Sequence, residues 1–186
     1  KDCVIVDPGD EAKRIKKFIE DQELHPVAIL LTHGHFDHVM AVDSVRTAYH
    51  IPVYAAEAEK ETMQDASINL SINMGGAMLS VEADHWLKDG ETITLLDQEV
   101  RCILTPGHTV GGMCFYFPKA GMLFSGDTLF QESVGRTDFP GGSMSEIVRS
   151  IREKLFVLPD AVQVYPGHGL MTSIKNEKMF NPFAVE

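Results

Sequence analysis

The sequence predicts an αββα fold, a four-layer sandwich in which two mixed sheets pack face to face and helices cover both outer surfaces. Two observations indicate this architecture. Apolar strand-like runs occur in pairs or are separated by segments with helical periodicity. In addition, four strand-like runs end in a glycine-containing turn that carries histidine or aspartate. We therefore expect a single functional site at one edge of the sandwich.

The length and composition are those of one globular domain spanning residues 1–186. Apolar residues make up 44% of the chain and charged residues 23%, both ordinary fractions. No run approaches the roughly 18 apolar residues of a membrane span, and the start has no signal-peptide pattern. Cys3, Cys102 and Cys114 lie in strand-like runs without paired spacing, which predicts reduced thiols and a cytoplasmic location.

The charge balance bears on the possible partners. The formal net charge is −11, from 27 acidic and 16 basic side chains. Such an excess of acidic groups opposes non-specific binding to nucleic acid, which depends on the neutralisation of phosphates by lysine and arginine. We therefore expect neither a nucleic acid nor a membrane among the partners.

The first part of the chain alternates strand and helix. Residues 3–6 form a short strand that ends in a Pro-Gly turn. Asp10 is a suitable N-cap for a helix that extends to about residue 22, and residues 27–31 form the next strand. The apolar side of this helix carries Ala12, Ile15, Phe18 and Ile19.

The middle of the chain is less uniform. We expect a helix over 39–49, a strand over 52–55 and an acidic helix over 57–66. Residues 67–78 are weakly patterned, which is typical of a surface connection. Their methionines also suit a mobile wall of a substrate pocket, because methionine adapts to varied ligands.

The second half of the chain is richer in strands. Residues 92–96 and 99–104 form a hairpin with a turn at Asp97-Gln98. Residues 113–117 and 122–125 form two further strands. A helix over 146–155, capped by Ser143 or Ser145, precedes a final strand over 162–165.

A dense group of ligand-type side chains lies in residues 32–38, Thr-His-Gly-His-Phe-Asp-His. The segment follows an apolar run directly, so it is expected to be a loop that leaves a strand end. Gly34 allows the backbone to fold so that alternate side chains converge. Imidazole and carboxylate groups are ligands that suit zinc, iron and manganese. The candidate ligands are His33, His35, Asp37 and His38.

Three later turns each present one further candidate ligand. His108 follows the strand-like run 101–104, Asp127 follows 122–125 and His168 follows 162–165. The remaining histidines do not lie in a glycine turn after a strand, so we expect them to be structural or surface residues: His25, His50 and His85.

With these residues in this order, the sequence resembles the metallo-β-lactamase-fold hydrolases, and among them the glyoxalase II-like branch with its short bacterial type II members. The resemblance covers nearly the whole chain, and it implies that a strand pair normally present before residue 3 is missing here. It also implies two metal-binding sets joined by one carboxylate: His33, His35 and His108; Asp37, His38 and His168; and Asp127 as the bridge.

The resemblance implies a hydroxyacylglutathione hydrolase-like enzyme with one or two divalent metal ions, zinc first and iron or manganese as alternatives. A metal-bound hydroxide would attack a small thioester such as an S-acyl glutathione, and Asp37 would orient the attacking water or accept its proton. Arg136 matches the basic residue that contacts glutathione in this family. Alternatively, Arg136 ties its loop to Asp138, since arginine serves both uses.

The main alternative function is oxidative. Persulfide dioxygenases share the fold and signature, and their Gly-Arg-Thr-Asp-Phe loop resembles residues 135–139. They bind one iron through two histidines and a carboxylate, which here would be His33, His108 and Asp127. A β-lactamase is less favoured, because nothing beyond the shared ligands points to it. The flavin-linked di-iron branch is also less favoured, because His35 stands where that branch has glutamate. The complete ligand set argues against a non-catalytic metal scaffold.

Overall fold

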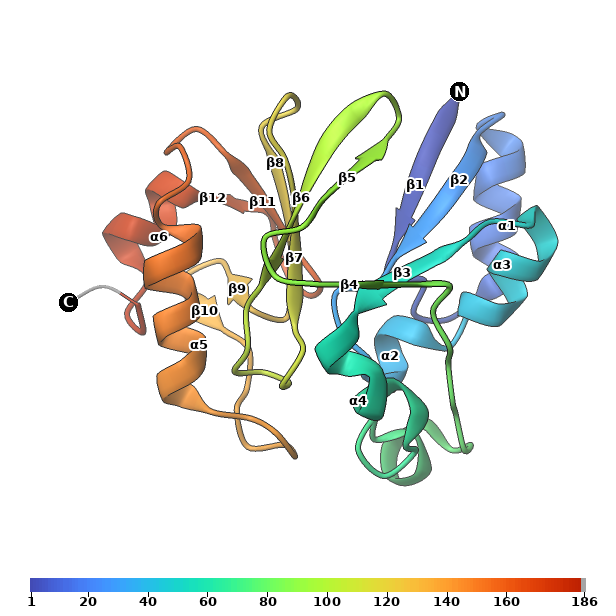
Figure 1. Ribbon diagram of the computed structural model, residues 1–186, viewed down its shortest axis with the longest axis horizontal. Coiled ribbons are helices and arrows are strands. Elements are labelled where there is room, and N and C mark those ends of the chain that lie inside the picture. Colours follow the sequence, from blue (N-terminus) through green and yellow to red (C-terminus); the bar gives the residue numbers. More distant parts are fainter. Residues whose placement is uncertain (185–186) are drawn as a thin grey trace.

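The computed structural model describes residues 1–184, and its layers are helix, sheet, sheet and helix (Figure 1). Two sheets face each other at the centre of the molecule. Helices α1 (Ala12–Asp21) and α3 (Val42–Tyr49) lie outside the first sheet. Helices α5 (Met144–Ser150) and α6 (Ile174–Phe180) lie outside the second sheet. The predicted αββα sandwich is confirmed.

The first sheet has four strands in the order β1-β2-β3-β4, and each pairs in parallel with the next. Parallel neighbours need a crossover connection, and α1 and α3 supply the first two on the outer face. The strands are β1 (Asp2–Val6), β2 (His25–Leu30), β3 (Val53–Ala56) and β4 (His85–Leu87).

The second sheet is mixed, with six strands in the order β12-β11-β8-β7-β6-β5. β8 and β11 pair in parallel, and the other neighbours are antiparallel. Leu96 and Asp97 join β5 to β6 with φ values of 53° and 55°. Two positive values in succession match the twist of a tight hairpin, and the turn lies one residue before the predicted position. The strands are β5 (Thr92–Leu95), β6 (Gln98–Leu104), β7 (Met113–Phe117), β8 (Met122–Gly126), β11 (Gln163–Pro166) and β12 (Thr172–Ser173).

Short elements connect the two sheets to the helical layers. The helix expected over 39–49 is split into α2 and α3, and the helix expected over 146–155 changes from α5 to a π-helical segment. The short elements are α2 (Phe36–Val39), η1 (Glu57–Glu59), α4 (Lys60–Gln64), η2 (Ser71–Gly75), β9 (Leu129–Phe130), β10 (Ser133–Val134) and η3 (Ile151–Leu155).

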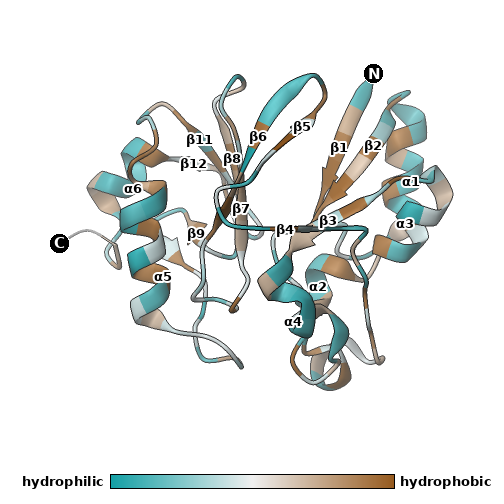
Figure 2. Cartoon of the chain, in the orientation of Figure 1, coloured by the Kyte–Doolittle hydropathy of each residue, from teal (hydrophilic) through white to brown (hydrophobic). Residues whose placement is uncertain are grey.

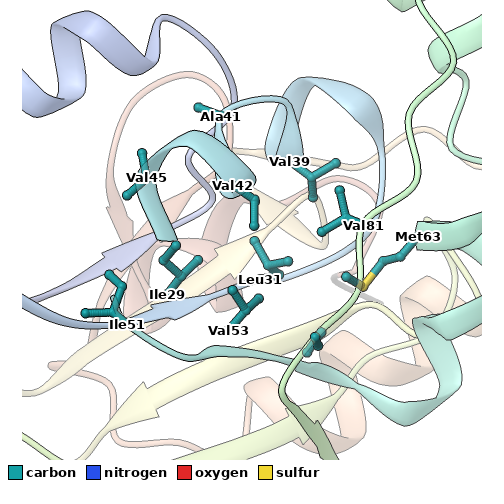
Figure 3. Close-up of a cluster of buried hydrophobic side chains, with 12 residues drawn as sticks. Ile29, Leu31, Val39, Ala41, Val42, Val45, Ile51, Val53, Met63 and Val81 are labelled. Atoms are coloured by element: carbon teal, nitrogen blue, oxygen red, sulfur yellow. The ribbon is translucent and has the colours of Figure 1, made fainter. Parts of the chain in front are cut away.

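Three apolar clusters fill the three spaces between the four layers. Strand β2 and the residue after it show how the sequence builds two of them, because successive side chains of a strand point to opposite faces. Ala28 and Leu30 belong to the cluster between the sheets. Ile29 and Leu31 face the helical side, where Val42 of α3 packs against the same cluster (Figure 3). The strands are accordingly mostly hydrophobic and the outer helices have hydrophilic stretches (Figure 2).

Some secondary-structure predictions are wrong. Asp10 is not the N-cap, because α1 begins after Glu11. Phe18 is 60% exposed and therefore does not belong to the apolar side of α1. The strand over 162–165 is not the last, since β12 and α6 follow it, and β4, β9 and β10 had not been predicted. Ser143 caps α5, as one of the two predicted candidates, with its hydroxyl accepting from the Glu146 amide (3.4 Å).

Two further sequence predictions can be compared with the structure. Cys3, Cys102 and Cys114 are all unpaired, and Cys102 and Cys114 are buried, in agreement with reduced thiols that fill the core. Within residues 1–184, no helix has both the length and the apolar character needed to cross a bilayer.

Candidate metal centre

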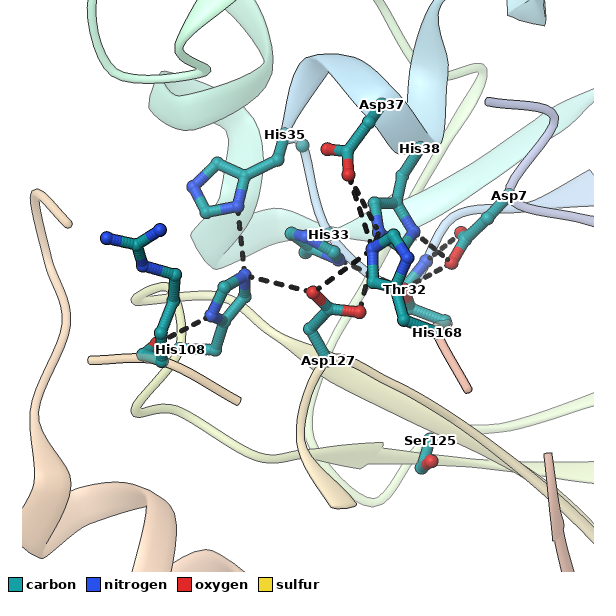
Figure 4. A network of polar contacts seen from close by, with 12 residues as sticks. Asp7, Thr32, His33, His35, Asp37, His38, His108, Ser125, Asp127 and His168 are labelled. Carbon is teal, nitrogen blue, oxygen red and sulfur yellow. Dashed lines mark hydrogen bonds and ion pairs between the residues drawn. The ribbon is translucent and has the colours of Figure 1, made fainter. Parts of the chain in front are cut away.

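All seven candidate ligands predicted from the sequence lie together at one edge of the sandwich (Figure 4). The segment with the first four follows β2 of the first sheet. His108, Asp127 and His168 follow β6, β8 and β11 of the second sheet. The site therefore lies between the two sheets, where loops from both meet.

The first set contains three buried imidazoles. One ring nitrogen each from His33, His35 and His108 lies within 4.8 Å of the others. Nδ1 of His35 is 2.9 Å from Nε2 of His108. The other nitrogen of His108, Nδ1, donates to the carbonyl oxygen of Arg136 (2.7 Å), so Nε2 presents its lone pair to the site. The three rings can therefore hold a cation from one side.

The second set lies beside the first and contains Asp37, His38 and His168. Nε2 of His38 is 3.2 Å from Nε2 of His168. Oδ2 of Asp37 is 3.2 Å from the same nitrogen of His168. His168 and Asp37 are partly exposed, with side-chain exposures of 54% and 41%, whereas His38 is buried. This set therefore opens toward solvent.

Asp127 lies between the two sets. Its Oδ1 is 3.4 Å from Nε2 of His38, and its Oδ2 is 3.6 Å from Nε2 of both His108 and His168. Burial raises the pKa of this carboxyl, although the histidines around it act in the opposite direction. A carboxylate in this position can share its oxygens between two neighbouring cations.

Three buried polar atoms of the site lack a hydrogen-bond partner among the described residues: His33 Nε2, His35 Nε2 and Asp127 Oδ1. A buried polar atom without a partner costs free energy. Nitrogen and carboxylate lone pairs of this kind are also the ligands that divalent transition metals bind. The residues present therefore fit a metal centre.

The protonation of the imidazoles differs between the two sets. Burial lowers the pKa of His33 well below its ordinary value, and nearby histidines lower it further. Burial, followed by the His108 charge, lowers the pKa of His35 to about 3, and burial also lowers that of His108. These rings are neutral at pH 7, the form that binds a cation.

His38 behaves differently from the other buried histidines. Burial acts to lower its pKa, but the hydrogen bond and the charge of Asp7, together with Asp127 and Asp37, raise it to about 9. From the sequence alone, Asp7 is only the residue between the strand over 3–6 and its Pro-Gly turn, and this role was not predicted. Asp7 has a left-handed backbone conformation with φ 47°. Its position two residues before Gly9, after an apolar strand like those before the other ligands, was the signal that could have found it.

Arg136 lies at the cavity beside the candidate ligands, where it is bonded within its own loop. Its Nε and Nη2 each donate to the carboxylate of Asp138 at 2.7 Å. The guanidinium carbon is 3.8 Å from the centre of the Phe139 ring. Arg136 also contributes the carbonyl that orients His108. The predicted contact between Arg136 and Asp138 is thus observed. A substrate could contact only the edge of the guanidinium that is not bonded to Asp138.

A cavity of about 410 Å³ adjoins the ligands, and its wall combines apolar and polar side chains. Met74, in the weakly patterned segment 67–78, is part of this wall. The lining residues that are not candidate ligands are Phe36, Leu70, Met74, Phe130, Ser133, Val134, Arg136 and Phe139.

The other histidines lie outside these sets. His25 is on the surface, 3.7 Å from Asp2, and His85 stacks on Tyr54 with ring centres 4.4 Å apart. His50 ends α3 in a left-handed conformation. The structure thus separates them from the ligand cluster, as predicted.

The sequence model of the metallo-beta-lactamase superfamily matches residues 1–168, a range that includes all seven candidate ligands. The chain belongs to the metallo-β-lactamase superfamily. Among curated members, the probable metallo-hydrolase YqgX of Bacillus subtilis is 41% identical over 97% of this chain and 86% of its own length. The hydroxyacylglutathione hydrolase GloC of Haemophilus influenzae is 34% identical over 98% of this chain and 87% of its own length.

Solved structures of metallo-β-lactamase superfamily members agree with this fold. The B3 metallo-β-lactamase BLEG-1 has a TM-score of 0.95 and 40% identity, over 100% of this chain and 90% of that chain. TTHA1623 in a di-iron-bound form has a TM-score of 0.85 and 36% identity, over 96% and 87% of the two chains. ETHE1 from Myxococcus xanthus has a TM-score of 0.80 and 26% identity, over 98% and 74%. Since GloC is described as a hydroxyacylglutathione hydrolase and BLEG-1 as a β-lactamase, the substrate must be inferred from the site.

Proposed function

We propose that this chain is a metal-dependent thioester hydrolase of the glyoxalase II type. The observation that carries the proposal is the gathering of six donor residues around Asp127, the seventh, beside an open cavity. The 34% identity to the hydroxyacylglutathione hydrolase GloC supports a thioester as the substrate. The substrate class is a small thioester such as an S-acyl glutathione.

The two sets would hold one metal ion each, and Asp127 would bridge them. Zinc is our first choice for the metal, and the di-iron form of TTHA1623 supports iron as an alternative. When bound, a divalent cation supplies a water of lowered pKa as nucleophile and a positive charge that stabilises the developing oxyanion. Asp7 and the carbonyl of Arg136 would keep the ring nitrogens of His38 and His108 directed into the site.

Asp37 is the proposed acid–base residue. Its carboxylate is partly exposed and lines the cavity in which the substrate would sit. A carboxylate there can orient a water molecule and accept its proton. His168, 3.2 Å from Oδ2, is the group next to it.

The cavity suits a substrate with an apolar part next to its reacting carbonyl. Phe36, Leu70 and Phe130 supply apolar surface, and Met74 can adjust to different shapes. Arg136 is the basic residue of the lining, and we propose that its unpaired edge contacts a carboxylate of the substrate. The three unpaired cysteines support the cytoplasm, where thiols are kept reduced, as the proposed location.

A persulfide dioxygenase with one iron is the second candidate. His33, His108 and Asp127 would supply its two histidines and one carboxylate, and Oδ2 of Asp127 lies 3.6 Å from Nε2 of His108. Residues 135–139 form the loop that resembles this group, and they border the cavity through Arg136 and Phe139.

Metal analysis and three assays on the purified chain test the proposal. We expect one or two metal ions per chain and hydrolysis of S-lactoylglutathione. Oxygen uptake with glutathione persulfide, together with a single iron per chain, would instead establish the dioxygenase. Because BLEG-1 is described as a B3 metallo-β-lactamase, a chromogenic cephalosporin serves as the third substrate. Cephalosporin turnover without thioester cleavage would overturn the thioesterase proposal.

A further inference from the structure

Glu59 of η1 is a buried carboxylate outside the candidate ligand set, and it joins the two loops that carry His33, His35 and His108. The residue is 1% exposed. Its Oε1 accepts from the amide of Gly34 (3.0 Å). Its Oε2 accepts from the amide of Gly111 (2.7 Å) and from the hydroxyl of Thr109 (3.0 Å). One carboxylate thus spans two loops that are more than 70 residues apart in the sequence.

These donors stand directly beside the imidazoles. Gly34 lies between His33 and His35, and Thr109 follows His108. A shift of either backbone would move a ring nitrogen relative to the other two. The carboxylate of Glu59 therefore fixes the distance between the two loops.

Backbone packing brings both loops onto the segment that carries Glu59. A Cβ added at Gly111 would lie 2.3 Å from the amide nitrogen of Glu59, and one added at Gly34 would lie 2.9 Å from that of Met63. Contacts this short require glycine at both positions. Residues 57–64 therefore act as a common support beneath the two loops.

Burying a carboxylate is costly, so its donors must offset a real penalty. Within residues 1–184, no lysine, arginine or histidine forms an ion pair with Glu59; its hydrogen-bond donors are those of the two loops and the side chain of Thr62 in α4. A neutral or apolar residue would fill the same space at lower cost. The position is explained if the negative charge is needed to hold the loops.

We propose that Glu59 is a positioning residue that sets the spacing of His33 and His35 against His108 for metal binding. The proposal rests on the metal centre of the proposed function. It requires no particular substrate. Outer hydrogen-bond partners of metal ligands commonly change metal affinity by about 10–100-fold when they are mutated.

Glu59→Gln is the informative variant because glutamine has the same shape but one acceptor side. With its oxygen toward Thr109 and Gly111, its NH2 group would face the amide of Gly34, donor against donor. Glu177→Gln is the matched control. Glu177 is 0% exposed and accepts from Glu132 N, Thr172 Oγ1, Asn176 Nδ2 and Asn181 Nδ2, none of them next to a candidate ligand.

Zinc affinity of the full chain, measured at pH 8 by competition with a chromogenic chelator, tests the proposal without any activity assay. We expect Glu59→Gln to weaken one zinc site by about 10–100-fold. We expect Glu177→Gln to lower the melting temperature but to keep both zinc dissociation constants within about twofold of the original chain. Equal affinities in Glu59→Gln and the original chain, or equal losses in both variants, would overturn the proposal.

If the Glu59→Gln chain does not fold, two other measurements test the proposal. Thr109→Val removes only one of the three hydrogen bonds from the two loops and should weaken zinc binding several-fold; unchanged affinity overturns the proposal. In the original chain with excess chelator, the amides of Gly34 and Gly111 should exchange slowly with deuterium, because Glu59 holds them without the metal. Fast exchange of both amides would count against it. Failure of the original chain to bind zinc would instead refute the metal centre itself.

Discussion

Oδ2 of Asp7 lies 2.9 Å from Nδ1 of His38 and 2.6 Å from the hydroxyl oxygen of Thr32. Oδ1 of the same carboxylate accepts from the amide of Thr32 (2.7 Å). The end of β1 is thereby tied to the loop that begins the ligand cluster. In the neutral ring, this contact keeps the proton on Nδ1, so that Nε2, which faces His168 and Asp127, is the nitrogen that loses its proton when a cation binds.

Asp7→Asn should weaken the metal set that contains His38. Asparagine offers one acceptor where the carboxylate serves both His38 and Thr32, so the ring loses its fixed orientation. We expect about 10–100-fold weaker binding of one metal ion, measured by chelator competition. Asp10→Asn is the control, since Asp10 lies three residues away on the surface and, within residues 1–184, accepts only from the neighbouring amide of Glu11. Unchanged metal content and affinity in Asp7→Asn would contradict this role.

His108→Ala or Asp127→Ala should abolish metal-dependent activity, with a loss of at least about 100-fold in kcat/KM. Each residue is placed to contribute directly to the metal centre, and Asp127 touches both sets. The measurement is thioester hydrolysis together with metal content per chain. His25→Ala is a suitable control because that ring is 75% exposed. Full activity in either ligand variant would show that the proposed ligand set is wrong.

Arg136 and Asp138 allow the two roles of the arginine to be separated. If Arg136 contacts a substrate carboxylate, Arg136→Ala should raise KM for S-lactoylglutathione about tenfold. Asp138→Asn should then leave KM unchanged or lower it, because the guanidinium is released. If Arg136 only ties the loop, the two variants should impair the enzyme alike. Steady-state kinetics of both variants, compared side by side, decide between the roles.

The pH dependence of stability should change when Glu59 is replaced. Burial raises the pKa of this carboxyl to about 7 from 4.5, although donors from Gly34, Thr109, Gly111 and Thr62 act to lower it. Between these two values the folded chain holds a proton that the unfolded chain has lost. Glu59 therefore makes the free energy of unfolding fall as pH rises from 4.5 to 7, and has no further effect above that.

Urea denaturation at pH 5 and pH 7.5 with chelator present measures this effect. The original chain should lose about 2 kcal/mol more than Glu59→Gln between the two pH values. Parallel profiles in the two proteins would show that Glu59 keeps an ordinary pKa. The Glu177→Gln chain controls for the removal of a buried carboxylate as such.

Much of the fold and most of the ligand cluster could be predicted because their signals are local. Each ligand follows an apolar strand and a turn, and strand ends at one edge of a sandwich meet. His33 and His168 are 135 positions apart, yet each is marked by its own neighbours. The strands β7 and β8 were equally clear, because continuous apolar runs bounded by Gly and Pro favour buried strands.

The missed features depend on contacts between distant segments. Glu59 has no local pattern that distinguishes it from other acidic residues. Asp7 follows an apolar strand and precedes a glycine, as the ligands do, but only the folded chain shows that it contacts His38. β4, β9 and β12 have two or three residues each, too few for a periodic signal. Phe18 follows the helical period of α1 but is 60% exposed, because a period marks a face of the helix and not how far the packing extends across it.

The origin of the ligands has a thermodynamic consequence. Four donors leave the first sheet after β2, and three leave the second sheet after β6, β8 and β11. An ion held by both groups is a cross-link between the two halves of the molecule, in addition to their apolar contact. Free zinc at 100 times its dissociation constant would add about 2.7 kcal/mol to the folded state. Occupancy by metal should therefore make the halves melt together, so that thermal resistance reports on the metal supply.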